Sequence, residues 1–436
     1  MVTTVAAGPR RLALQRAPLL LFLFGIALNQ TSVIFGLNLS IADVFAVVIL
    51  VLTAMTSRLF FPTGPTIFFC ALSLLVLIMG GFITPNVIPI DQTYTDVLSD
   101  YIKLATSFCY FLLGVNIVRA GQARLVLHAF ALTAAFIGVV AVVQTAIPAV
   151  PTIEFMFYGE IRFRGLMNDP NYFAVIQLVA MSVMWHDKDI ARRLRYPALV
   201  FLAASVLASG SKTGTLTLLI FALWRVVLAI FTRQRSGPGF SGYRILLAMA
   251  LPAGLIGLIL LFANRALRLS VAASLDQIPA LGRLGPLLVD FGSGIEMDGS
   301  ARDDAWLNAT KILEIFPFTG IGAGTYEEVA MELTGSPVLA HNTFLQIAAE
   351  WGLIFAAIIG VWILILLLRR PQAGTNLRLW ATTRDALLVI MIGSLGISLQ
   401  NSRLLWLIVG MLLAVHIFET VRRPVLNQEF HYVKKS

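Results

Sequence analysis

The sequence is poor in charged residues and in cysteine. Lysine, arginine, aspartate and glutamate make up 13% of its 436 residues, whereas 58% are hydrophobic and the mean hydropathy is +0.85. A water-soluble domain of this length would carry far more charge. Both cysteines, Cys70 and Cys109, lie inside apolar runs, so neither a disulfide framework nor a thiolate metal site is indicated. The composition therefore predicts a protein that is surrounded by lipid.

The chain also lacks a recognisable cleavable signal peptide, an internal repeat and a low-complexity tract. Its first apolar run has no small-residue cleavage site and leads straight into a second run. The formal net charge of +9 might point to nucleic acid in a soluble protein, but the basic residues collect in short clusters between apolar runs. At such positions they orient helices and contact anionic lipid, so we expect no nucleic-acid binding.

Apolar runs long enough to cross the bilayer follow one another along the whole chain. A helix needs about 20 apolar residues to span ~30 Å of hydrocarbon. We count twelve runs, at residues 17–35, 41–56, 66–83, 101–118, 125–147, 171–185, 197–208, 212–231, 245–263, 341–368, 386–399 and 404–419. The expected fold is an all-α integral membrane protein with about twelve transmembrane helices.

Lysine and arginine collect in every second loop, and this alternation predicts the orientation. Basic clusters precede the first run and follow the last, so both termini are expected in the cytoplasm. Loop 84–100 carries three aspartates and no basic residue, and is expected outside. Residues 1–263 then hold helices one to nine, 264–340 form a large outward loop with short helices, 341–421 hold helices ten to twelve, and 422–436 are a cytoplasmic tail. Within the loop, residues 300–315 have helical apolar spacing and the glycines of 316–326 end that helix.

Basic residues on the outward side contradict this charge bias and need a separate explanation. They are Lys103, Arg162, Arg164, Lys212 and Arg403 outside the large loop, and Arg265, Arg268, Arg283, Arg302 and Lys311 within it. Guanidinium groups match the geometry of a diphosphate, although long basic side chains also extend to lipid headgroups. Diphosphate binding and headgroup contact have equal weight for Arg162, Arg164, Lys212 and Arg302. Headgroup contact is favoured for the other basic residues.

One histidine of five, His341, is expected at the outer surface, at the start of the tenth helix. It would be the proton acceptor available there at neutral pH. A histidine at a helix start is more often structural, but Arg302 and the large loop lead directly into this one. Asn342 and Glu350 are candidate supporting residues. Glu350, about two turns further along the helix, either orients His341 or pairs with a neighbouring helix.

Two acidic groups have simpler explanations. Asp169 precedes Pro170, and this pair is typical of a helix start, with aspartate as the N-cap. Asp303 and Asp304 adjoin Arg302, but no histidine or third carboxylate stands beside them, so we expect neither a metal site nor another cofactor.

Several short stretches occur in an order and spacing that resemble those of a known superfamily. They read RFRGL at 162–166, DPNYFA at 169–174, SGSKTGTL at 209–216, RDDAW at 302–306, PFTGIGAGTY at 317–326 and His-Asn at 341–342, followed by Gly352. Together they resemble the O-antigen ligase and polymerase superfamily of bacterial membrane glycosyltransferases, over roughly residues 162–360. Lys212 stands where that family commonly has arginine, and Phe355 where it often has Gly, Thr or Tyr.

The resemblance implies an inverting transfer of a glycan from undecaprenyl diphosphate to a carbohydrate acceptor, without a metal. His341 and Arg302 would be catalytic, and Arg162, Arg164 and Lys212 would bind the diphosphate. The protein would lie in the bacterial inner membrane with its active site facing the periplasm. The acceptor stays open, because a ligase uses lipid A core, whereas a polymerase uses another lipid-linked repeat or a growing exopolysaccharide.

A transporter or flippase is the alternative from a different class. Polar residues such as Asn29, Gln30, Asp43 and Gln400 lie within or at the edges of the apolar runs. A transporter predicts a polar path between matching halves of the chain. The sequence has no such symmetry, and its candidate residues gather at one surface.

Overall fold

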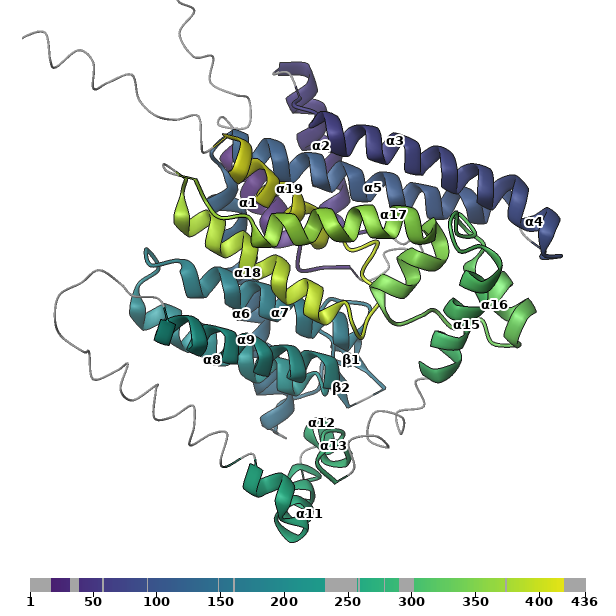
Figure 1. Ribbon diagram of the computed structural model, residues 1–436. Helices are drawn as coiled ribbons and strands as arrows, with labels where there is room; N and C mark the ends of the chain where they lie inside the picture. Colours follow the sequence, from purple (N-terminus) through teal and green to yellow (C-terminus); the bar gives the residue numbers. More distant parts are fainter. Residues whose placement is uncertain are drawn as a thin grey trace, which may run out of the picture.

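The computed structural model in Figure 1 describes residues 17–31, 39–56, 59–91, 93–147, 149–159, 161–231, 257, 259–277, 279–289, 302–372 and 375–418. These residues are mostly helical, and their single sheet has two short antiparallel strands, β1 (Phe157–Tyr158) and β2 (Arg162–Phe163). The expected all-α class is thus confirmed for this part of the chain.

In the described part of the chain, a helix occupies eleven of the twelve predicted apolar runs. The helices are α1 (Pro18–Ala27), α2 (Ile41–Thr56), α3 (Thr63–Ile78), α5 (Tyr94–Arg119), α6 (Ala123–Ala146), α7 (Pro170–His186), α8 (Arg192–Ala208), α9 (Lys212–Phe231), α17 (Thr343–Leu368), α18 (Leu377–Gly393) and α19 (Arg403–Phe418). Helix α3 continues through a π-helical turn, η2 (Met79–Ile83), into α4 (Thr84–Val87). Most of the run 245–263 lies outside the described residues.

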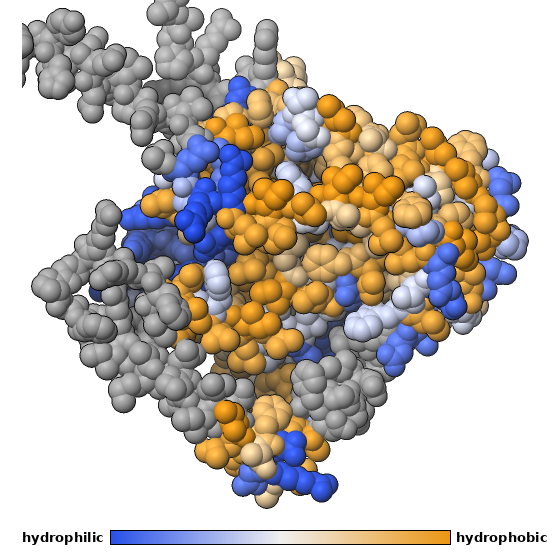
Figure 2. Space-filling view, viewed as in Figure 1, coloured by the Kyte–Doolittle hydropathy of each residue, from blue (hydrophilic) through white to orange (hydrophobic). Residues whose placement is uncertain are grey.

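By length and composition, four stretches of the described residues are suited to cross a membrane. They are Thr63–Val87, Tyr94–Arg119, Ala123–Ala146 and Thr343–Leu368, and α1, α2 and α19 are shorter apolar helices. Large apolar side chains lie on the surface of these helices, and Figure 2 shows them over much of one face of the bundle. A soluble monomer rarely exposes so large an apolar area, so the helices indicate a membrane protein.

Several helix boundaries differ from the predicted ones. Helix α1 ends at Ala27 rather than at residue 35, and α5 begins at Tyr94, where Thr93 and Asp96 form a capping box. Helices α8 and α18 begin at Arg192 and Leu377, so basic residues that we expected in loops lie in helical turns. The limits of the apolar runs did not predict these helical turns, because helical backbone hydrogen bonding continues beyond the apolar segment.

The centre of the bundle is the pair α5 and α19, and two glycines allow its close contact. A Cβ added at Gly114 would lie 2.2 Å from the Leu407 carbonyl oxygen, and one at Gly410 would lie 2.1 Å from that of Phe111. Small residues of this kind let membrane helices approach closely. On one side of this pair α18 packs against α7, which also contacts α6 and α8.

A buried ion cluster joins α7, α9 and α18. The fully buried Asp385 accepts hydrogen bonds from Arg225 Nη1 (2.7 Å) and Arg384 Nη2 (2.6 Å), and its Oδ2 lies 2.8 Å from His186 Nε2. Charges inside an apolar bundle are costly unless they are paired, so this cluster fixes the relative position of the three helices.

The long segment between the ninth and tenth runs contains short helices of its own. These are α11 (Arg265–Leu275), α12 (Pro279–Gly282), α13 (Gly285–Val289), α15 (Arg302–Ile315) and α16 (Tyr326–Thr334). The predicted helix at 300–315 is therefore confirmed as α15, and the glycine-rich stretch ends it. Helices α15 and α16 pack against each other, and α15 also packs against α17, around Ile312 and Val329.

Candidate active site

His341 stands immediately before α17, at the predicted start of the tenth helix. Asn342 is the N-cap, and its side-chain oxygen accepts hydrogen bonds from the backbone N–H groups of Phe344 (2.9 Å) and Leu345 (3.2 Å). His341 is exposed and has φ of 47°, the one positive φ among the described non-glycine residues. This left-handed conformation is unfavourable for a side chain with a Cβ, and strained residues of this kind concentrate at functional sites.

Helix α17 is interrupted at Gly352, whose φ of 77° and ψ of 162° are not helical. The glycine-rich stretch passes alongside this break and pairs with it through backbone hydrogen bonds. The N–H groups of Ile321 and Gly322 donate to the carbonyls of Ala349 and Glu350, both at 3.0 Å, and Leu353 N–H donates to Pro317 at 2.9 Å. An interrupted helix in an apolar bundle requires such partners for its freed backbone groups. The glycine-rich motif and Gly352 therefore form one structural unit.

The same stretch also contacts α3 and α5. Ala323 N–H donates to the Val76 carbonyl (3.1 Å), and Gly324 N–H donates to Asp100 Oδ2 (2.9 Å). A Cβ at Gly322 would lie 2.2 Å from the backbone nitrogen of Gly80, so no side chain fits there. The motif thus joins α17 to two helices from the N-terminal part of the chain.

The RFRGL, DPNYFA and SGSKTGTL motifs meet at the other side of the site, in a group that we call the basic cluster (Arg162, Arg164 and Lys212). Arg162 lies in β2 and donates from Nη2 to Asn171 Oδ1 (2.9 Å) and from Nε to the Ser209 carbonyl (3.3 Å). Lys212 begins α9, three residues after Ser209. The structure therefore brings Arg162 close to the turn that carries Lys212.

Arg164 and Asp169 belong to the same region. Arg164 donates to the carbonyl oxygens of Phe155 (3.4 Å) and Asn168 (3.3 Å). Asp169 caps α7, since its side chain accepts from the backbone N–H groups of Asn171 and Tyr172, as its position before Pro170 predicted.

One loop connects the basic cluster with the histidine. Asn342 Nδ2 donates to the Leu395 carbonyl (3.3 Å), and Thr343 Oγ1 donates to that of Ile397 (2.7 Å). Between these two residues, a Cβ at Gly396 would lie 2.4 Å from Oγ1 of Thr213, the neighbour of Lys212. The start of α17 and the start of α9 therefore flank the same loop, although they are far apart in the sequence.

Arg302 is the first residue of α15, and its side chain lies outside the described part of the structure. The contact of α15 with α17 is the observed link between its helix and the one that follows His341. Asp303 and Asp304 are exposed. Among the described residues, no group of three His, Cys, Asp or Glu side chains is arranged to hold a metal ion.

Glu350 lines a cavity, and it is hydrogen-bonded to a residue of its own helix. It accepts a hydrogen bond from Gln346 Nε2 (2.5 Å) and lines a cavity of about 220 Å³ together with four other carboxylates, Asp96, Asp100, Glu327 and Glu328. The sequence did not predict these four residues as part of the site. Asp96 and Asp100 belong to loop 84–100, whose aspartates indicated only an outward position.

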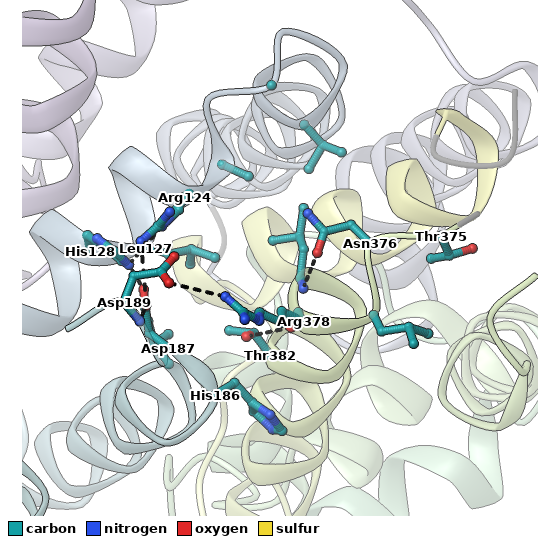
Figure 3. Close-up of a pocket in the computed structure, with 16 residues that line it drawn as sticks. Arg124, Leu127, His128, His186, Asp187, Asp189, Thr375, Asn376, Arg378 and Thr382 are labelled. Atoms are coloured by element: carbon teal, nitrogen blue, oxygen red, sulfur yellow. Dashed lines mark hydrogen bonds and ion pairs between the residues drawn. The ribbon is translucent and has the colours of Figure 1, made fainter. Parts of the chain in front are cut away.

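A larger cavity, of about 530 Å³, lies at the other end of the bundle and contains none of the predicted site residues (Figure 3). Its charged groups pair with one another. Asp189 binds both Arg124 Nη2 (2.6 Å) and Arg378 Nη1 (3.2 Å), and His128 contacts Asp187. These pairs join α6 and α18 to the turn that follows α7.

The fold and this site define a helical membrane protein whose polar residues converge around a histidine at one end of the bundle. Residues 197–360 match the family model described as O-antigen ligase, which confirms the resemblance to the O-antigen ligase superfamily. The match includes Lys212, Arg302, His341 and Gly352, whereas Arg162 and Arg164 precede it. No curated protein matches the chain.

Proposed function

We propose that this protein transfers a glycan from undecaprenyl diphosphate to a carbohydrate acceptor, at the periplasmic face of the bacterial inner membrane. The observation that supports this most is His341, an exposed histidine with a left-handed backbone beside a loop that also contacts the start of α9. The family match points to the same class of enzyme.

In this proposal the basic cluster binds the diphosphate of the donor, and Arg302 binds it as well. Negative charge accumulates on the diphosphate as its bond to the anomeric carbon breaks. Cations already fixed around it stabilise that charge without further reorganisation. Arg162 is fixed in this sense, since Asn171 and the Ser209 carbonyl hold its guanidinium group.

His341 takes the proton from the acceptor hydroxyl as its oxygen attacks the anomeric carbon. A new bond forms between the acceptor oxygen and that carbon, the carbon–oxygen bond to the diphosphate breaks, and undecaprenyl diphosphate leaves. Because the attack comes from the face opposite the leaving group, the anomeric configuration inverts. Exposure of His341 leaves it open to a large acceptor.

Reconstitution of the purified protein in sealed vesicles tests the proposal. The vesicles receive an undecaprenyl-diphosphate oligosaccharide, either alone or with lipid A core. Transfer to lipid A core identifies a ligase, and a ladder of longer lipid-linked chains from the donor alone identifies a polymerase.

The same vesicles test the transporter alternative. Transporters also use interrupted helices such as α17, at the site where they bind substrate. Movement of the donor or of a small solute across the vesicle membrane, without a new glycosidic product, would overturn the transferase proposal.

A further inference from the structure

The acidic residues around the cavity of about 220 Å³ that contains Glu350 come from three helices. Asp96 and Asp100 reach it from α5, Glu327 and Glu328 from α16, and Glu350 from α17. We call it the acidic cavity. Lys103 is the one basic residue among the described residues that line it, and its Nζ lies 2.5 Å from Asp100 Oδ1. Its carboxylates therefore far outnumber its cations.

Two buried polar groups of lining residues have no hydrogen-bond partner in the part of the chain that the structure describes. They are the hydroxyl of Tyr326, a residue 3% exposed, and the side-chain oxygen of Gln400, which is 5% exposed. Buried polar atoms are nearly always hydrogen-bonded, to protein, to water or to a ligand. Burial, with the nearby charge of Glu350, raises the pKa of the Tyr326 hydroxyl, so it stays protonated and able to donate. Two residues of the same cavity lining therefore carry a donor and an acceptor that have no partner among the described residues.

The charge of the cavity decides which ligands suit it. Burial raises the pKa of Glu328, and the neighbouring carboxylates of Asp96 and Glu327 raise it further. A phosphate or diphosphate would be repelled by these groups. A metal ion is disfavoured as well, because no three acidic side chains in the described part of the chain are arranged to enclose one. An uncharged ligand with many hydroxyl groups fits, since carboxylates and amides accept hydrogen bonds from hydroxyls.

The acidic cavity is connected to His341. Leu339, two residues before the histidine, lines it. Gln346 links the cavity to the residue before His341, because its Oε1 accepts a hydrogen bond from Ala340 N–H (2.9 Å) while its Nε2 donates to Glu350. The loop that contacts Thr213, beside Lys212, at Gly396 continues to Gln400 in the cavity lining. The same loop therefore borders both the start of α9 and the acidic cavity.

We propose that the acidic cavity is the acceptor subsite and binds the hydroxyl groups of a carbohydrate acceptor through Tyr326, Gln400 and the surrounding carboxylates. This inference rests on the proposed glycan transfer. It assigns the two substrates to different groups of residues, with the anionic donor at the basic cluster and the uncharged acceptor sugar at the acidic cavity.

The first test compares KM for the acceptor with KM for the donor in the variants Tyr326→Phe, Gln400→Met and Glu328→Gln. Loss of one hydrogen bond should raise the acceptor KM about 3- to 10-fold and leave the donor KM unchanged. Tyr326→Phe removes only an unpartnered hydroxyl, so its fold should persist. Glu332→Gln is the matched control, since Glu332 is exposed on the same helix as Glu328 and lies outside the cavity lining. Unchanged acceptor KM in all three variants, or a higher donor KM instead, would overturn the assignment.

The second test measures binding without turnover. Full-length protein in nanodiscs is titrated by calorimetry with free core oligosaccharide, with the repeat-unit oligosaccharide released from the donor, and with calcium chloride. Saturable binding of one oligosaccharide, weakened by Tyr326→Phe and not by Glu332→Gln, is the expected result. Binding of neither sugar, or calcium binding that Glu328→Gln abolishes, would refute the subsite. Oligosaccharide binding without any transfer would instead refute the proposed reaction and leave a carbohydrate site.

Discussion

Replacement of Gly352 by alanine tests the junction between the interrupted helix α17 and the glycine-rich stretch. The φ and ψ of Gly352, 77° and 162°, lie in a region that is essentially restricted to glycine. An added Cβ would lie 2.1 Å from the Phe318 carbonyl oxygen and 2.4 Å from its carbon. The backbone must therefore move, and the hydrogen bond from Leu353 N–H to Pro317 would be lost.

The expected loss in free energy of unfolding follows from these contacts. Backbone strain of this type costs about 1–3 kcal/mol, and the lost hydrogen bond about 0.5–1.5 kcal/mol. Gly352→Ala should therefore destabilise the protein by roughly 2–4 kcal/mol. Gly360 lies in the same helix with no heavy atom within 4 Å of an added Cβ, so Gly360→Ala should stabilise the helix by about 0.5–1 kcal/mol.

Equilibrium unfolding of both purified variants in mixed micelles, followed by tryptophan fluorescence, measures these differences. Shifts of opposite sign are expected. The acceptor KM of Gly352→Ala should also rise, because Glu350 lies two residues before the break. A Gly352→Ala protein as stable as Gly360→Ala would refute the interrupted-helix reasoning.

Three further predictions concern the remaining polar groups. The His341→Asn protein should fold normally, because asparagine tolerates the left-handed region, but it should lose glycan transfer. Arg302→Ala should be equally inactive. Normal polysaccharide display by cells carrying His341→Asn would remove the histidine from the mechanism. Lys212→Arg should retain or improve transfer, whereas Lys212→Gln should lower the transfer rate about 10²- to 10³-fold. A Lys212→Gln rate equal to that of the unchanged protein would indicate that Lys212 contacts lipid headgroups instead. Asp385→Ala should lower the free energy of unfolding by about 3–5 kcal/mol without a change in either KM, and an altered KM would argue against a purely structural ion cluster.

Features that depend on a few neighbouring residues were predictable from the sequence. The apolar runs predicted most of the long helices, Asp169 and Pro170 predicted the start of α7, and residues 300–315 predicted α15. His341 stands at the helix start that the sequence indicated. These predictions hold because helix formation and capping are governed by side chains within one or two turns. The helix ends were less accurate, since charged turns extend α5, α8 and α18 beyond their apolar segments.

Contacts between distant segments were decided by the tertiary structure alone. Gly352 and the glycine-rich stretch are separate motifs in the sequence, but their backbones exchange hydrogen bonds at the break in α17. Arg162 reaches the turn before α9 only because the strand β2 lies beside it. The acidic cavity exists because α5 and α16 bring Asp96, Asp100, Glu327 and Glu328 to Glu350. Each depends on which helices pack together, and apolar runs of similar composition contain no information about their neighbours.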